Sequence, residues 1–274
     1  MTETTRGDTA LNERWLAWLR ENVDNGADFR AAYHVLREAG FSDKAIARAV
    51  DVVRPPDSAL ADGTLPTPPL IARAPANLRR LDERIELYAL DGFLDARECA
   101  DLMAIVSDHL APSPVASDGS DYGFRTSRTC QFSPLRNPLA AAVDAKICTT
   151  FGYRASYGEG IQAQWYDVGQ QFKAHTDFFP PGTRVYLRFA GVRGNRTWTF
   201  MVYLNDGMQG GGTRFPDLGL TVQPRAGMAL LWNNLFPNGT PNPATQHAGE
   251  PVTAGHKVVI TKWFRVQGSG ALLV

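Results

Sequence analysis

The C-terminal part of the sequence consists mainly of short apolar segments separated by turn-forming residues. After residue 160 these segments are IQAQWYDV, RTWTFMVYLN, GLTVQP, GMALLWNN and KVVITKWFRV, with clusters of Gly, Pro or Asn between them. Segments of this kind are typical of β-strands bounded by turns. Because they are not interleaved with long helical patterns, they favour an antiparallel sandwich or jelly roll over repeated βαβ units.

Helical patterns occur before this strand-rich part. The stretch ERIELYALDGFLDARECADLMAIVSDHL predicts a strand and then a helix that begins after Asp95, whose side chain can cap it. A second helix is predicted for NPLAAAVDAKICTTFG. The expected fold class is therefore α+β, with a double-stranded β-helix (jelly roll) and flanking helices.

The N-terminal residues predict a small helical module that is separate from the jelly roll. Residues 1–53 carry three apolar stripes at helical spacing, with Gly40 suited to end a helix and Ser42 to cap the next. Residues 54–75 are rich in proline and lack periodicity, so we expect a semi-rigid linker there. The jelly-roll domain then covers 76–268. The module has either a capping or a docking role.

The composition excludes some classes of partner. The 274 residues are 44% hydrophobic, and the 28 basic residues balance the 28 acidic ones, so neither nucleic acid nor a membrane is an expected partner. The polar N-terminus and the lack of a long apolar run predict a cytoplasmic location. Cys99, Cys130 and Cys148 are odd in number and widely spaced, which predicts reduced core thiols. The sequence specifies no oligomeric state.

A candidate metal site begins in QFKAHTDFF, which contains His175 and Asp177. An extended chain projects residues i and i+2 from the same face, so a strand here would bring the imidazole and the carboxylate together. His247 follows the GMALLWNN segment and precedes the last strand, where a third ligand is expected. Two imidazoles and one carboxylate leave three positions open on an octahedral metal, as in non-haem iron(II) oxygenases.

The last predicted strand adds a buried cation. Alternation in KVVITKWFR places Lys257, Val259, Thr261 and Trp263 on one face. If that face lines the interior, Lys257 points inward, and a lysine is rarely buried without a partner. The carboxylate of a ligand would provide one.

Several linked motifs together resemble the prolyl 4-hydroxylase-type branch of the iron(II)/2-oxoglutarate-dependent dioxygenases. They occur in that family's order over roughly residues 85 to 265, and they are FRTSRTCQF, HTD, YLNDGMQGGGTRFPDLG, VQPRAGMALLWNNL and HAGEPVTAGHKVVITKWF. The resemblance implies that His175, Asp177 and His247 are the iron ligands.

The same resemblance implies a cosubstrate site and a reaction. Lys257 would bind the distal carboxylate of 2-oxoglutarate, with hydrogen bonds from Tyr166 and Thr213. The implied cofactors are Fe(II), 2-oxoglutarate and O2, with ascorbate as a further candidate. The implied reaction hydroxylates an unactivated C–H bond and releases succinate and CO2. Asp177 favours hydroxylation, because related halogenases lack this carboxylate.

The sequence specifies the acceptor, the molecule that is hydroxylated, less closely than it specifies the iron and 2-oxoglutarate sites. Arg196 and Arg125 match segments near the family's substrate side, and Trp263 is a third candidate substrate-binding residue. The expected acceptor is a prolyl residue of a peptide or protein. A free amino acid or small metabolite is the alternative, and a non-catalytic interaction protein led by the N-terminal helices is a second one. We expect residues 178–196 to form a long surface loop.

Overall fold

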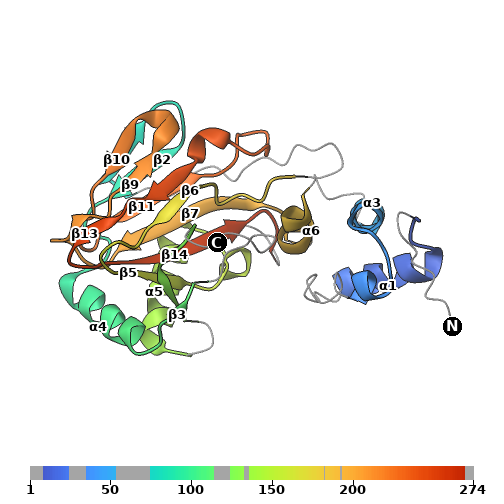
Figure 1. The fold of residues 1–274 in the computed structure, drawn as a ribbon, viewed down its shortest axis with the longest axis horizontal. Coiled ribbons are helices and arrows are strands. Elements are labelled where there is room, and N and C mark those ends of the chain that lie inside the picture. The colour runs from blue at the N-terminus through green and yellow to red at the C-terminus, as the bar shows by residue number, and fades with distance from the viewer. Residues whose placement is uncertain are drawn as a thin grey trace. The chain divides into compact units, whose positions relative to one another are not determined.

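The computed structural model describes residues 9–24, 35–53, 75–113, 124–132, 136–181, 183–191 and 193–268 (Figure 1). The predicted linker therefore lies outside the described residues, apart from Pro75. The chain divides into two compact units. The larger contains Thr67–Phe178, Arg196–Phe236 and Pro241–Val274, and the smaller contains Met1–Pro66, Phe179–Asn195 and Pro237–Thr240.

The larger unit is built on antiparallel sheets, as the strand pattern predicts. An eight-stranded sheet has the order β1-β2-β11-β7-β14-β5-β4-β3. Its strands are β1 Leu78–Asp82, β2 Leu87–Leu90, β3 Ala111–Pro112, β4 Arg128–Gln131, β5 Gln162–Tyr166, β7 Arg196–Tyr203, β11 Ala229–Asn233 and β14 Lys257–Arg265. Four of the five predicted strand segments after residue 160 thus supply the centre of this sheet, and the fifth, GLTVQP, contributes β10 to the smaller sheet described next.

A smaller sheet faces the first and has the order β10-β9-β12-β6. Its strands are β6 Phe172–His175, β9 Thr213–Phe215, β10 Leu220–Val222 and β12 His247–Gly249. A third sheet pairs β8 with β13, and its strands are β8 Gln209–Gly210 and β13 Val252–Ala254. The described residues of this unit also form three 3-10 turns, at Ala155–Tyr157, Pro216–Leu218 and Pro243–Thr245.

Two helices cover the outer face of the large sheet: α4, Ala96–Ser107, and α5, Pro138–Phe151 (Figure 1). Both were predicted. Asp95 caps α4 through a capping box with Glu98, and Asn137 accepts hydrogen bonds from the first turn of α5. The buried faces of the two helices share one apolar core with the sheet residues that point toward them.

A second apolar core lies between the two sheets. The alternation along β14 divides its side chains between the two cores. Val258, Ile260 and Phe264 pack in the helix-side core, whereas Val259 packs in the core between the sheets. Lys257 stands on the same face as Val259, as the sequence predicts. The space between the sheets is therefore where polar residues of the strands can meet.

The smaller unit contains the described N-terminal helices and one further helix. These helices are α1 Glu13–Asp24, α3 Asp43–Val53 and α6 Arg184–Ala190. Leu19, Leu36, Phe41 and Ile46 are fully or almost fully buried in a core of their own. The second of the three helical stripes predicted for residues 1–53 falls largely on residues outside the described ranges.

The prediction of a loop for residues 178–196 was wrong in part, because α6 lies within it. Thr183 caps this helix by accepting a hydrogen bond from the Tyr186 amide. The two ends of the segment are joined by Asn195, whose side chain accepts from the Phe179 amide and donates to the Phe179 carbonyl, at 2.8 and 2.9 Å. The prolines and glycines in the segment bound a short helix and do not keep it irregular throughout.

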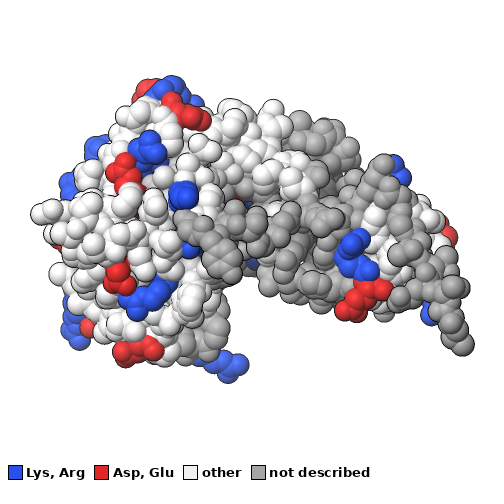
Figure 2. All heavy atoms as spheres, viewed as in Figure 1, with Lys and Arg blue, Asp and Glu red and all other residues white. Residues whose placement is uncertain are grey.

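Two predictions from composition can be compared with the described residues. Cys99, Cys130 and Cys148 are free and buried, which confirms that they are core thiols. No described helix is long and apolar enough to cross a bilayer. In the described part of the face shown in Figure 2, basic and acidic side chains are interspersed, in keeping with the neutral charge balance.

Candidate active site

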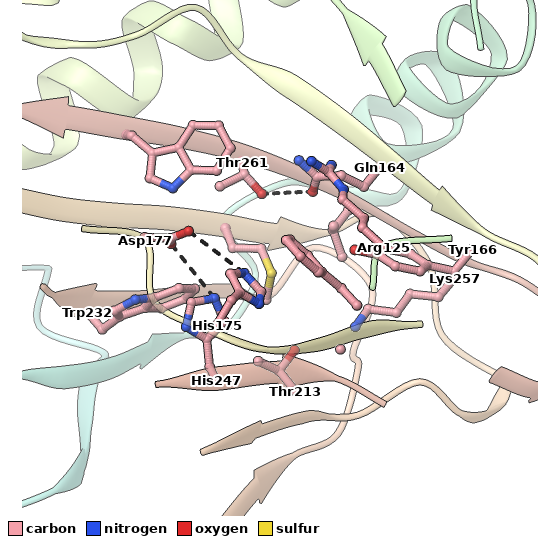
Figure 3. A pocket seen from close by; sticks show the side chains of 15 residues that line it. Arg125, Gln164, Tyr166, His175, Asp177, Thr213, Trp232, His247, Lys257 and Thr261 are labelled. Atoms are coloured by element: carbon pink, nitrogen blue, oxygen red, sulfur yellow. Dashed lines mark hydrogen bonds and ion pairs between the residues drawn. The ribbon is translucent and has the colours of Figure 1, made fainter. Parts of the chain in front are cut away.

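A cavity opens between the two sheets of the larger unit (Figure 3). Side chains from both sheets line it. The lining residues are Arg125, Gln164, Tyr166, Phe172, His175, Asp177, Met201, Thr213, Trp232, His247, Gly249, Lys257, Val259, Thr261 and Trp263. The sequence singled out most of the polar members of this set.

The smaller sheet brings His175 and His247 together. They are direct register partners on β6 and β12, with ring centroids 4.3 Å apart. The Asp177 carboxylate faces both rings, with its oxygens 3.9 Å from His175 Nε2 and 3.8 Å from His247 Nε2 (Figure 3). One ligand atom from each residue lies within 4.8 Å of the others. The three predicted ligands therefore converge.

The predicted strand ends earlier than QFKAHTDFF suggested. β6 stops at His175, and Asp177 lies in a bend just beyond it. The carboxylate is held in place by Thr199 on β7, whose hydroxyl donates a 2.6 Å hydrogen bond to Asp177 Oδ2. Convergence of His175 and Asp177 thus depends on a contact with the large sheet in addition to strand geometry.

The protonation of the two histidines suits metal binding. Nδ1 of His175 lies 2.8 Å from the Lys173 carbonyl and Nδ1 of His247 lies 3.0 Å from the Thr245 carbonyl, so each Nδ1 carries the proton. The Nε2 lone pairs are thereby left facing Asp177. Burial, together with the nearby His247, lowers the pKa of His175 to about 3, which keeps its ring neutral.

The donor set fits a ferrous ion. Burial disfavours the charged form of Asp177, but the two histidines, Arg196 and the Thr199 hydrogen bond outweigh it and lower the pKa of this carboxyl group. Two imidazoles and a carboxylate on one side of a cavity are the donor set of the facial triad found in non-haem iron(II) oxygenases. The other side opens into the cavity, where further ligands could bind.

The large sheet places a lysine near this cluster. Lys257 is 2% exposed and is the register partner of Tyr166 on β5. Its Nζ lies 5.4 Å from the centroid of the Tyr166 ring and 5.5 Å from the centroid of the Tyr203 ring. Tyr203 donates a 2.7 Å hydrogen bond to the Thr213 hydroxyl. Burial lowers the pKa of Lys257 to about 7, although Glu250 acts in the opposite direction. A carboxylate bound here would restore the charged form.

The three predicted substrate residues occupy different places. Arg125 and Trp263 line the cavity. The guanidinium of Arg125 donates to Ser127 at 3.1 Å and to Gln162 at 3.1 Å, and it lies 4.9 Å from the Phe172 ring centroid. Burial lowers its pKa.

Arg196 does not belong to the cavity lining. Its guanidinium donates two 2.8 Å hydrogen bonds to the Glu159 carboxylate and lies 3.9 Å from the centroid of the Trp263 ring. Glu159 also accepts a 2.8 Å hydrogen bond from Arg265. Arg196 therefore packs against Trp263, which in turn lines the cavity.

The sequence motifs did not indicate Thr199, Tyr203 and Glu159 as residues of this region. The first two lie on the cavity side of β7, so the alternation of Thr197, Thr199, Met201 and Tyr203 could have indicated them. Glu159 lies between the 3-10 turn Ala155–Tyr157 and β5, and no pattern in the sequence links it to the two arginines.

Replacing Glu159 by glutamine is expected to destabilise the protein. The change leaves the buried guanidinium of Arg265 and the partly buried guanidinium of Arg196 beside a neutral amide. Loss of these charge-assisted hydrogen bonds is expected to cost roughly 1.5–3 kcal/mol of unfolding free energy. Burial raises the pKa of Glu159, but Arg196 and Arg265 outweigh it and bring the pKa to about 2, below the ordinary 4.5. The stabilisation is therefore complete above pH 4.5 and is lost as the pH falls toward 2.

Urea unfolding at neutral pH and at successively lower pH measures both effects. Asp101→Asn is the control, since its pair with Arg97 is exposed and is worth less than roughly 1 kcal/mol. Equal stabilities of Glu159→Gln and Asp101→Asn at neutral pH would contradict the assigned role of Glu159.

Comparison with known proteins agrees with the site. Residues 161–265 match the model of the 2OG-Fe(II) oxygenase superfamily. The chain is 31% identical over 218 residues to the Arabidopsis thaliana protein named "Probable prolyl 4-hydroxylase 4", covering 70% of this chain and 71% of that one. It is 33% identical over 156 residues to the human prolyl 4-hydroxylase subunit alpha-1, covering 57% of this chain. The chain spans only 29% of the length of that subunit.

The fold has a counterpart among solved structures. The viral collagen prolyl hydroxylase vCPH of Paramecium Bursaria Chlorella virus-1, solved as a 2OG complex, aligns with a TM-score of 0.52 at 24% identity. The alignment covers 65% of this chain and 95% of that one. The chain belongs to the 2OG-Fe(II) oxygenase superfamily. Within it, the curated relatives named above are prolyl 4-hydroxylases.

Proposed function

We propose that the protein is an iron(II)- and 2-oxoglutarate-dependent dioxygenase that hydroxylates a prolyl residue of a peptide or protein. The single observation that carries this proposal is the geometry of one cavity, in which a His-Asp-His cluster and a buried lysine face the same space. The names of the curated relatives support a prolyl acceptor. We further propose that the two facing sheets form a double-stranded β-helix.

In this proposal His175, Asp177 and His247 hold the ferrous ion. Iron with bound 2-oxoglutarate supplies the oxidising chemistry with O2. Lys257 binds the distal carboxylate of 2-oxoglutarate, because a buried ammonium needs a negative partner. Tyr166 and Thr213 lie in the same part of the cavity and assist it. Ascorbate is proposed as an additional reductant.

Arg125 and Trp263 are proposed to position the acceptor. An arginine at the cavity wall offers donors for backbone carbonyls, and the Trp263 ring offers an apolar face. Arg196 is proposed to act on the acceptor through Trp263, since its guanidinium stacks on this ring and is held by Glu159. A peptide substrate presents both backbone carbonyls and an apolar prolyl ring.

A mass-spectrometric assay tests this function. The protein is incubated in air with Fe(II), 2-oxoglutarate and a library of proline-containing peptides, in parallel with free amino acids. The expected result is a gain of one oxygen on a prolyl residue, with one succinate formed for each hydroxylation. Oxidation of a free amino acid and of no peptide would support the metabolite alternative and contradict the peptide proposal.

A further inference from the structure

The large sheet carries a buried polar patch directly behind Asp177. It consists of Thr197 and Thr199 on β7, Trp232 on β11 and Asn234 just after β11, each at most 1% exposed. Trp232 and Thr199 are register partners, so their side chains share one face of the sheet. Farther along the same face the residues are part of the core between the sheets. On β11 the polar side chains of this face thus lie at the end nearest Asp177.

A chain of hydrogen bonds runs through this patch to the carboxylate. Asn234 Nδ2 donates to Thr199 Oγ1 at 2.8 Å, and Thr199 Oγ1 donates to Asp177 Oδ2 at 2.6 Å. Its direction follows from the groups themselves. An ionised carboxylate only accepts, so the single hydroxyl proton of Thr199 goes to Asp177. Asn234 must then present its NH2 group to the oxygen of Thr199.

The unpaired polar groups of this patch lower the stability of the folded protein. Among the described residues, four buried side-chain N or O atoms have no hydrogen-bond partner, and three of them belong to this patch: Thr197 Oγ1, Trp232 Nε1 and Asn234 Oδ1. Each such group costs roughly 1–3 kcal/mol of stability unless it is satisfied. Apolar side chains of similar size would fill this space with a smaller loss of stability. Stability alone therefore does not account for Thr199 and Asn234.

We infer that Asn234 and Thr199 are positioning residues for the metal site, fixing the orientation in which Asp177 presents its carboxylate to the ion. This inference rests on the proposed function. The Thr199 hydroxyl occupies one side of Oδ2, while the carboxylate oxygens keep their approach to His175 and His247. Hydrogen bonds to a ligating carboxylate typically govern metal affinity in this way.

The test is metal binding by the apoprotein, measured by calorimetric titration with Co(II) and by the visible spectrum of the bound Co(II). Thr199→Val keeps the shape of the side chain and removes the hydroxyl. It is expected to lower Co(II) affinity by roughly 10–100-fold. Thr199→Ser retains the hydroxyl and is expected to restore most of the affinity. Asn234→Ala should lower affinity as well, because it frees the Thr199 hydroxyl to rotate.

Thr197→Val provides the matched control. This threonine lies on the same strand and face and is equally buried, but it stands outside the hydrogen-bond chain. Its Co(II) affinity should equal that of the wild type. Thr199→Val also leaves Asn234 Nδ2 without its acceptor, which is expected to lower the stability of the apoprotein. The melting temperature of each apoprotein measures this loss separately, and the titrations are made well below it, where every variant is folded.

The titrations distinguish a failure of the positioning role from a failure of the proposed function. Tight Co(II) binding by Thr199→Val and Asn234→Ala, equal to the wild type, would overturn the positioning role and leave the proposed function intact. Absence of metal binding by the wild-type protein would instead overturn the proposed function.

Discussion

Replacing His247 by alanine is expected to abolish metal binding and to reduce turnover at least roughly 10³-fold, since the metal supplies several kcal/mol of transition-state stabilisation. His247 contributes a neutral imidazole from β12, and its Nδ1–H is held by the Thr245 carbonyl. The remaining pair, His175 and Asp177, cannot complete a facial triad. Metal content after dialysis and succinate formation measure the two losses.

His256→Ala is the control for this variant. This histidine stacks on Trp165 with ring centroids 4.6 Å apart, and it does not line the cavity. Its loss should leave metal content and turnover unchanged. Full metal content in His247→Ala would show that the ion is held elsewhere.

Replacing Lys257 by methionine is expected to abolish use of 2-oxoglutarate while making the apoprotein more stable. The ammonium is 2% exposed, and its pKa is lowered to about 7 by burial. Methionine has a similar length and no charge to bury. The gain in unfolding free energy is roughly 1–3 kcal/mol, the usual cost of a buried group without a strong partner. In a chain of this size that corresponds to a rise in Tm of roughly 2–4 °C per kcal/mol.

The pH dependence of this effect has a definite sign. The folded pKa of Lys257, about 7, lies below the ordinary value of 10.5, so between these values the unfolded chain binds more protons than the folded one. The contribution of Lys257 to the free energy of unfolding of the wild type therefore rises as the pH increases from 7 to 10.5. The variant lacks that rise. Thermal unfolding of both apoproteins across this range measures it. A lower Tm for Lys257→Met throughout would contradict the assignment of a buried, uncompensated charge.

The elements of the site could be predicted better than the contacts that join them. The alternation in KVVITKWFR correctly placed Lys257, Val259, Thr261 and Trp263 on the cavity face, because strand periodicity is a local property. The convergence of His175, Asp177 and His247 was predicted from their places relative to the strands. The register that pairs His175 with His247 is set by the tertiary fold, and no local pattern specifies it.

Local patterns can place a residue on the cavity side of a strand, but they do not specify the contacts through which it acts on another residue. Thr199 looked like an ordinary strand residue, and its role depends on Asp177 lying past the end of β6. Arg196 was predicted to lie near the acceptor from its motif alone. In the structure its Nε and one terminal nitrogen donate to Glu159, and Trp263 covers the face of its guanidinium. Such roles are decided by partners distant in sequence. The position of α6 was missed because its short apolar pattern is bounded by prolines and glycines.

The most direct test of the account is anaerobic absorption spectroscopy of the wild-type protein with Fe(II) and 2-oxoglutarate. Chelation of the ferrous ion by 2-oxoglutarate gives a weak visible charge-transfer band that neither component produces alone with the protein. This band is expected in the wild type and is expected to be absent from His247→Ala. A wild-type protein that binds Fe(II) tightly but develops no band at saturating 2-oxoglutarate would contradict it.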